Sequence, residues 1–234
     1  MKYKLGLLAI TFVGAFAAEI NVGCSNRFIV KTGYSKLNND NLYKNHMLDN
    51  ALYQLESEGN IGHINRNFCG HRVFGFGYSY KHYLPKDFFI GFNTGYENSD
   101  NKVHSEVKND QYTTLVDFKL KHSINIMPVV GITIKNFDIY AMMGIEYKQV
   151  NYSQRIDIQV DSDEFNDYKV HNWRGMYTWG AGVDMRINEK ASLGIEYKKT
   201  RIKFSFIEYP NDLRDKTHFK ADHHTVSVTF KYKF

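Results

Sequence analysis

Six segments of this chain alternate between apolar and polar residues, and the glycines within them fall on the polar side. A period of two indicates a β-strand with one apolar and one polar face. In the fifth segment, the apolar positions start at Tyr177 and Trp179, whereas Gly180, Gly182 and Asp184 take the opposite parity. The segments are residues 28–36, 73–81, 88–98, 139–148, 177–187 and 191–198.

The position of the glycines separates two kinds of β-barrel. A soluble, lipocalin-like barrel turns its apolar face inward around a ligand and its charged face to water, where glycine has no packing role. In a narrow membrane barrel the polar face points inward, and glycine makes room for long charged side chains. The pattern therefore favours a transmembrane barrel with aromatic and aliphatic residues facing lipid.

The connections between segments alternate between tight and long. Residues 84–87, 135–138 and 188–190 are expected to be tight turns, and residues 38–71, 98–115, 151–171 and 207–222 long polar loops. Three tight turns alternating with four long loops predict an all-β fold, an eight-stranded antiparallel up-and-down transmembrane β-barrel with both termini on the tight-turn side. Short periplasmic turns and long outer loops are the outer-membrane arrangement.

The N-terminus predicts export from the cytoplasm. Lys2 and Lys4 precede a short apolar run that ends in Ala15-Phe16-Ala17, the pattern of a secretory signal peptide. We expect residues 1–17 to be the signal peptide and residues 18–234 the barrel domain. Without the two lysines, 28 basic residues face 25 acidic ones, a balance too mild to predict nucleic-acid binding. The mean hydropathy of −0.47 also suits a barrel, because lipid-facing and lumen-facing residues average out.

The last strand, residues 226–234, alternates up to the final residue, and we expect it to close the barrel against the first strand. With these features the chain resembles the small eight-stranded outer-membrane barrels, a family that includes the OmpA membrane domain, opacity-type surface proteins and porin-like proteins. The resemblance implies an integral protein of the Gram-negative outer membrane, in contact with its lipid and lipopolysaccharide, and usually no enzymatic activity. It also implies that the barrel-assembly machinery reads the C-terminal aromatics Phe230, Tyr232 and Phe234.

The alternation of the strands predicts which residues point outward and which point inward, and it defines two groups of side chains. Each ascending strand ends in a tyrosine, and the four tyrosines are expected to form an aromatic girdle at the outer interface: Tyr34, Tyr96, Tyr147 and Tyr197. Charged residues of inward parity are expected to form a paired, hydrated network in the lumen: Lys31, Lys81, Glu97, Glu146, Lys148, Asp184, Arg186, Glu196, Lys198, Lys231 and Lys233.

One strand fits the pattern less well, because Pro128 falls on its apolar face in mid-strand. Proline removes a ladder donor and is typical of bulges, so we expect a bulge at residues 127–128. Cys24 is expected on the periplasmic side and Cys69 at the end of the first outer loop. Because the apolar band is about 25 Å tall, these cysteines are not expected to form a disulfide with each other.

Catalytic and metal sites are not predicted. His122 and Ser123, the adjacent pair that suggests lipid A-modifying chemistry, are neighbours on a strand and point to opposite faces. His223 and His224 are divided in the same way. His63, Cys69 and His71 share a loop without a ligand spacing, and the acidic residues Asp163, Glu164 and Asp167 are ordinary for a loop tip. We therefore expect no enzyme, no metal and no cofactor.

Two functions remain open at this stage. The first is a structural scaffold whose loops interact with or adhere to a host or neighbouring-cell surface. The second is a narrow porin-like channel for small solutes or ions. Eight strands leave little room for a pore, so the sequence favours a lumen filled by salt bridges.

Overall fold

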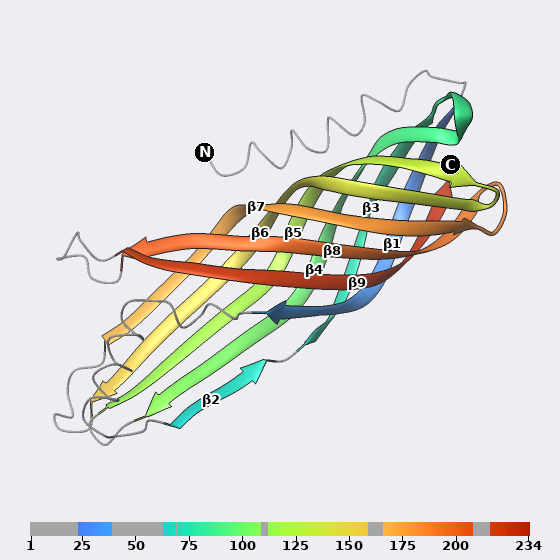
Figure 1. Cartoon of the computed structure of the whole chain (residues 1–234). Coiled ribbons are helices and arrows are strands. Elements are labelled where there is room, and N and C mark those ends of the chain that lie inside the picture. The colour runs from blue at the N-terminus through green and yellow to red at the C-terminus, as the bar shows by residue number, and fades with distance from the viewer. Residues whose placement is uncertain (1–22, 39–62, 69, 109–111, 159–165, 208–215) are drawn as a thin grey trace.

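The structure is a computed structural model that describes residues 23–38, 63–68, 70–108, 112–158, 166–207 and 216–234 (Figure 1). These residues form strands and one short 3-10 turn. The elements are β1 (Cys24–Asn38), β2 (His63–Phe68), β3 (His71–Tyr83), η1 (Pro85–Asp87), β4 (Phe88–Lys108), β5 (Tyr112–Ile134), β6 (Phe137–Ile158), β7 (Asn166–Arg186), β8 (Ala191–Ile207) and β9 (Lys216–Lys233). Among the described residues, no helix is long and apolar enough to cross a membrane.

The sheet closes into a barrel. Each strand from β3 to β8 pairs antiparallel with the strand that follows it, and β1 pairs with both β3 and β9. The remaining strand, β2, pairs only with the far end of β4, so eight of the strands form the ring. This confirms the eight-stranded antiparallel up-and-down barrel, closed by the last strand against the first, where Arg27 is the partner of Lys233.

The cross-strand register fixes the tilt of the strands. Following direct partners once around the ring leads from Met185 on β7 to Gly175 on the same strand, ten residues away. With strands about 4.8 Å apart and a rise of about 3.3 Å per residue, this stagger gives a tilt of about 41° and a backbone radius of about 8 Å. The oblique course of the strands is visible in Figure 1.

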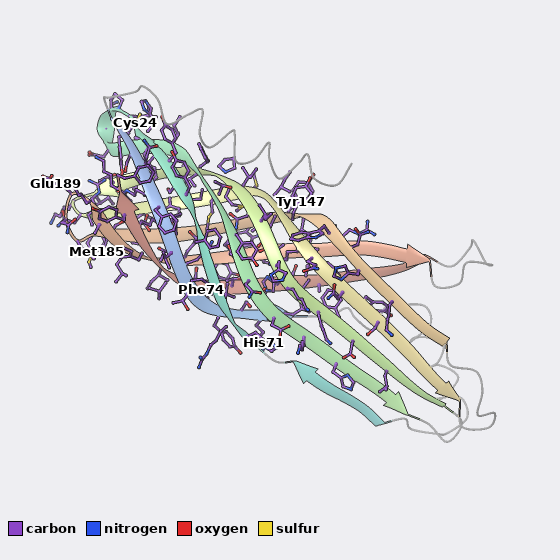
Figure 2. All side chains as sticks on the ribbon, turned by 180° about the vertical axis from the view of Figure 1, so that it is seen from behind. Cys24, His71, Phe74, Tyr147, Met185 and Glu189 are labelled. Carbon is purple, nitrogen blue, oxygen red and sulfur yellow. The ribbon has the colours of Figure 1, made fainter. Side chains whose placement is uncertain are left out.

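Many large apolar side chains are exposed on the outer face, among them Phe74, Tyr147 and Met185, which are labelled in Figure 2. On β6, the outward positions are apolar from Phe137 to Tyr147 and polar beyond, at Gln149 and Asn151. At a tilt of about 41°, the ten steps from Phe137 to Tyr147 rise about 25 Å, which equals the apolar band of outer-membrane barrels, about 25 Å. The outward face is therefore the lipid-facing face.

The tight turns lie at the end of the barrel that carries the C-terminus (Figure 1). Lys86, Asp87 and Lys135 have positive φ values of 64°, 64° and 54°, the left-handed conformation of short hairpin turns. In the third turn, the Asn188 side chain accepts hydrogen bonds from the backbone amides of Lys190 (2.9 Å) and Ala191 (2.7 Å). Cys24 lies at this same end, and Cys69 is outside the described residues.

The prediction of four long loops was partly wrong, because the strands continue far beyond the apolar band. Strands β4 to β7 are 21 to 23 residues long, and β2 adds a short strand that the sequence did not predict. In these extensions the pattern is reversed: apolar side chains such as Phe118, Leu120 and Val150 are buried inside, and the outward positions are polar. The outward face of a strand was expected to be apolar, so these segments were predicted to be loops. About ten residues are enough to cross the membrane, so roughly half of each long strand projects from it.

The expected bulge at Met127–Pro128 was also wrong. The β4–β5 register runs through Pro128, which is the partner of Phe92, without a shift. The β5–β6 register is likewise the same on both sides of Pro128, although residues 127 and 128 have no partners in that pairing. The register shifts lie farther from the tight turns, between Asn98 and Asn101 on β4 and between Leu120 and Ser123 on β5. The ladder thus accommodates the missing N–H of proline without an inserted residue.

Candidate functional site

The barrel lumen contains an upper charged cluster drawn from four strands. Glu97 of β4 lies at its centre and accepts ion pairs at one oxygen from Lys31 Nζ of β1 (2.5 Å) and from Lys198 Nζ of β8. Glu146 of β6 pairs with Lys148 (3.1 Å) and with Lys198 (3.7 Å). All members are buried, and three cations face three anions: Lys31, Lys148 and Lys198 with Glu97, Glu146 and Glu196.

Hydroxyl and amide groups add hydrogen bonds to this cluster. Asn125 donates to the Glu97 carboxylate at 2.9 Å. Thr178 and Thr200 both donate to Oε2 of Glu146, at 3.2 and 2.7 Å. Buried charges are tolerated when they are paired and hydrogen-bonded. The upper cluster meets both conditions, so it forms a fixed cross-link between strands on different sides of the lumen.

A lower charged cluster lies nearer the tight turns. Lys81 Nζ contacts Asp138 at 2.9 Å and Asp184 at 3.0 Å, and Lys231 Nζ contacts Asp184 at 2.8 Å. Arg186 pairs with Asp138 at 2.6 Å. With Arg27, which lies 3.8 Å from Asp138, the lower cluster holds four cations around two carboxylates. Its excess positive charge lies at the tight-turn end of the barrel.

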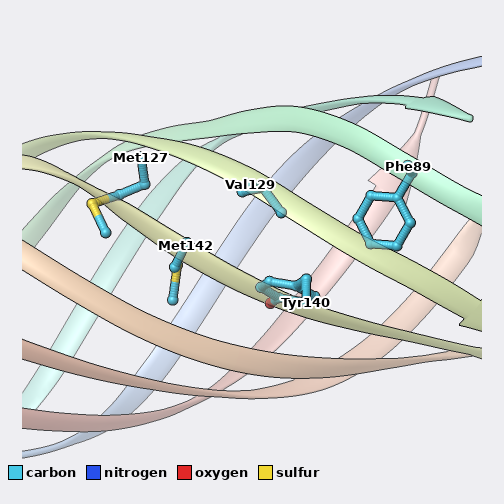
Figure 3. Close-up of a cluster of buried hydrophobic side chains, with 5 residues drawn as sticks. All are labelled: Phe89, Met127, Val129, Tyr140 and Met142. Carbon is cyan, nitrogen blue, oxygen red and sulfur yellow. The ribbon is translucent and has the colours of Figure 1, made fainter.

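An apolar cluster occupies the lumen beside the lower charges (Figure 3). It consists of Phe89, Met127, Val129, Tyr140 and Met142, from the adjacent strands β4, β5 and β6. Lys81 Nζ lies 4.5 Å from the ring centre of Phe89, and Lys231 Nζ lies 4.8 Å from that of Tyr140, so the cations rest on aromatic faces. The sequence did not predict this cluster, although strand parity already places its members inward.

Tyr140 joins the charged clusters. Its hydroxyl donates toward Glu196 Oε2 of the upper cluster at 3.2 Å and toward Asp184 Oδ1 of the lower cluster at 3.4 Å, and it accepts from Lys231 at 3.0 Å. The Tyr140 ring covers Gly182, its cross-strand partner, where an added Cβ would overlap the ring. Glycine is required at this position because the tyrosine fills the space.

Eleven charged residues were expected in the lumen, and the nine other than Lys231 and Lys233 all point inward. Eight are buried, and the Arg186 side chain is 33% exposed at the tight-turn end. The expectation missed Arg27 and Asp138. Asp138 had been assigned to a turn, and Arg27 lay just before the first alternating segment. Lys231 is buried in the lower cluster, whereas Lys233 is exposed at the barrel end.

The four ascending-strand tyrosines point outward. Tyr96 and Tyr147 share one register row through Ile124, and Tyr34 and Tyr197 share another through Val226. The hydroxyls of Tyr96 and Tyr197 lie 2.7 Å from Nδ1 of His122 and His224, respectively. At the other end of the barrel, the C-terminal aromatics are exposed on the outer face: Phe230, Tyr232 and Phe234.

The structure does not bring together the described residues that were considered as catalytic or metal-binding groups. Ser123 is buried in the lumen, whereas His122 lies on the outer face, and His223 and His224 are divided in the same way. Within the described ranges, no group of three or more His, Cys, Asp or Glu side chains could hold a metal ion. The side chains of His63, Cys69, Asp163, Glu164 and Asp167 and the expected signal peptide, residues 1–17, lie outside the described part of the structure.

A family model described as "Outer membrane protein beta-barrel domain" matches residues 5–234. The chain belongs to this family. It is an integral β-barrel of the outer membrane, as both the match and the closed apolar-outside ring show. No curated protein matches the sequence.

Several solved outer-membrane barrels are similar in structure to this protein. Neisserial surface protein A has 12% identity and a TM-score of 0.48, with 91% of this chain and 99% of that chain covered. OprG from Pseudomonas aeruginosa has 14% identity and a TM-score of 0.40, covering 92% and 99%. Ail of Yersinia pestis, solved with the heparin analogue sucrose octasulfate, has 12% identity and a TM-score of 0.39, covering 90% and 99%.

Proposed function

We propose that this protein is a non-conducting structural scaffold of the outer membrane. It holds long strand extensions and loops outside the membrane for interaction with, or adhesion to, a host or neighbouring-cell surface. The observation that carries the proposal is the filled lumen, in which charged clusters and an apolar cluster are linked through Tyr140. The proposal includes no catalysis, cofactor or nucleic acid.

The size of the barrel supports a closed lumen. A backbone radius of about 8 Å leaves an interior that side chains alone can fill. The upper cluster spans it from Lys31 on β1 through Glu97 on β4 to Lys198 on β8. An ion crossing this layer would have to break paired, buried charges, which is costly. The strand extensions, by contrast, offer polar side chains and backbone to the exterior, where loops commonly carry function.

The refolded protein is expected to give no conductance steps above the leak of a planar bilayer, because the upper charged cluster blocks the lumen. The Lys31→Ala/Glu97→Ala/Lys198→Ala variant removes two cations and one anion from this cluster and is expected to admit water and small ions. A matched control truncates exposed charges outside the barrel, Asp100→Ala/Lys102→Ala, and is expected to stay closed. Regular conductance steps from the wild-type protein would contradict the scaffold proposal.

A narrow channel is the second candidate, and one observation favours it. Several buried lumen atoms have no hydrogen-bond partner within the protein, among them Ser79 Oγ, Asn93 Oδ1, Ser227 Oγ and Thr229 Oγ1. Buried polar atoms of this kind are normally satisfied by water. A hydrated path past the charged clusters would make the protein porin-like, and the same bilayer recording distinguishes this candidate from the scaffold.

A further inference from the structure

A basic patch lies on the outer face of β1 and β8, just beyond the apolar band and on the side opposite the tight turns. Its members are Lys36, Lys199, Arg201 and Lys203. Lys199 and Lys36 belong to one register row, joined through His224. The next outward row toward the membrane is Tyr197, Val226 and Tyr34. The outer face therefore changes from aromatic and apolar to cationic within one step of the strand pleat.

The patch carries more positive charge than its neighbours neutralise. Asp222 is the acidic side chain in contact, at 2.7 Å from Lys199 Nζ and 3.6 Å from Arg201 Nε. The Arg201 side chain remains 62% exposed, at the point where the β7–β8 pairing ends with Tyr177. Among the described side chains, four cations with one carboxylate leave an excess of about three positive charges.

The opposite side of the barrel lacks this excess. On β4 and β5, Lys102 lies 3.5 Å from Asp100, and His104 lies 3.0 Å from Asp117. Among the described side chains of this region, the outward cations are Lys102, Lys119 and Lys121. Acidic side chains thus offset much of the charge there, so the β8–β9–β1 side is the cationic side at this height.

We propose that the basic patch binds the phosphate groups of lipid A in the outer leaflet. The depth of the patch argues for a lipid rather than a soluble ligand, because the aromatic row directly below it marks the membrane interface. Arg201 supplies a planar fork suited to phosphate oxygens, and the lysines add point charges. Lys36 and Lys199 lie two strands apart, about 10 Å, a spacing that suits a head group with more than one phosphate. This site is independent of the filled lumen and of the loops.

The test is lipid retention by the refolded protein in detergent micelles, measured by native mass spectrometry. The probes are bisphosphorylated lipid A, phosphate-free lipid A and a soluble heparin fragment. The patch variant is Lys36→Gln/Lys199→Gln/Arg201→Gln, and the control, Lys102→Gln/Lys119→Gln/Lys121→Gln, removes the same charge from the opposite side. Heat-modifiable gel mobility establishes that each variant is folded, and Arg201→Gln alone replaces the triple variant if that variant does not fold.

The expected result is that the patch variant retains bisphosphorylated lipid A at least tenfold more weakly than wild type, while the control stays within about twofold. Phosphate-free lipid A is expected to bind the wild type as weakly as bisphosphorylated lipid A binds the patch variant. Equal losses in both triple variants, or equal binding of the lipids with and without phosphate, would overturn the proposal. Patch-dependent binding of the heparin fragment without patch-dependent binding of lipid A would overturn it as well.

Discussion

Replacing Glu97 by Gln is expected to lower the free energy of unfolding by about 3–5 kcal/mol, the typical effect of removing one partner from a buried ion pair. The Glu97 carboxylate is 2% exposed and accepts from Lys31, Lys198 and Asn125. The neutral amide would leave the upper cluster with three cations and two anions, and buried charges without partners are costly. Equilibrium urea unfolding of the protein refolded into lipid vesicles measures the change.

Asp100→Asn is the matched control for Glu97→Gln. It removes a carboxylate from the exposed pair with Lys102, and exposed pairs contribute at most about 1 kcal/mol. Adding Lys198→Met to Glu97→Gln is expected to recover part of the lost free energy of unfolding, because it removes one of the cations that lost its carboxylate partner. A Glu97→Gln variant as stable as the Asp100→Asn control would contradict the account of the lumen.

Replacing Ile195 by Arg is expected to destabilise the folded barrel by about 2–4 kcal/mol, the effect of arginine at the midplane of the lipid face. Ile195 lies on the outer face of β8, between Leu193 and Tyr197. Refolding yield and urea unfolding in vesicles provide the measurement. Lys199→Arg on the same strand keeps a cation beyond the band and is expected to change stability little. If Ile195→Arg folds in lipid as readily as Lys199→Arg, the apolar face does not contact lipid.

The ring of eight strands could be predicted from the sequence because local patterns determine it. Alternation identifies each strand where one face meets lipid, and tight turns such as residues 188–190 fix the neighbours. The alternation reverses at the edge of the apolar band, where the outward positions become polar and apolar residues turn inward. Beyond Tyr147, for example, β6 continues with Gln149 and Asn151 outward and with Val150 and Tyr152 buried inside, so a search for an apolar outward face does not detect this part of the strand.

The contacts inside the lumen were harder to predict because they depend on the stagger of the whole barrel. Parity places Lys31, Glu97 and Lys198 inward, but their meeting requires the ten-residue offset around the ring. Asp138 was missed because it was assigned to the turn at residues 135–138, whereas β6 already begins at Phe137. The apolar cluster around Phe89 was missed because inward positions were expected to be polar.

Contact between the outward face of each strand and lipid is the central feature of this barrel, and adjacent residues of β6 test it at one depth. Met142 is buried in the lumen, and Met143 is 71% exposed on the outer face. In a background with Trp173→Phe and Trp179→Phe, single tryptophans at these positions are compared for quenching by lipids brominated on their acyl chains.

The Met143→Trp variant is expected to be strongly quenched and the Met142→Trp variant little affected. A second pair, Ile90→Trp outside and Phe89→Trp inside, repeats the comparison if tryptophan at Met142 overfills the lumen. Strong quenching of the outward and weak quenching of the inward tryptophan is the result that the account predicts. Equal quenching of the two, or stronger quenching of the inward tryptophan, would contradict it.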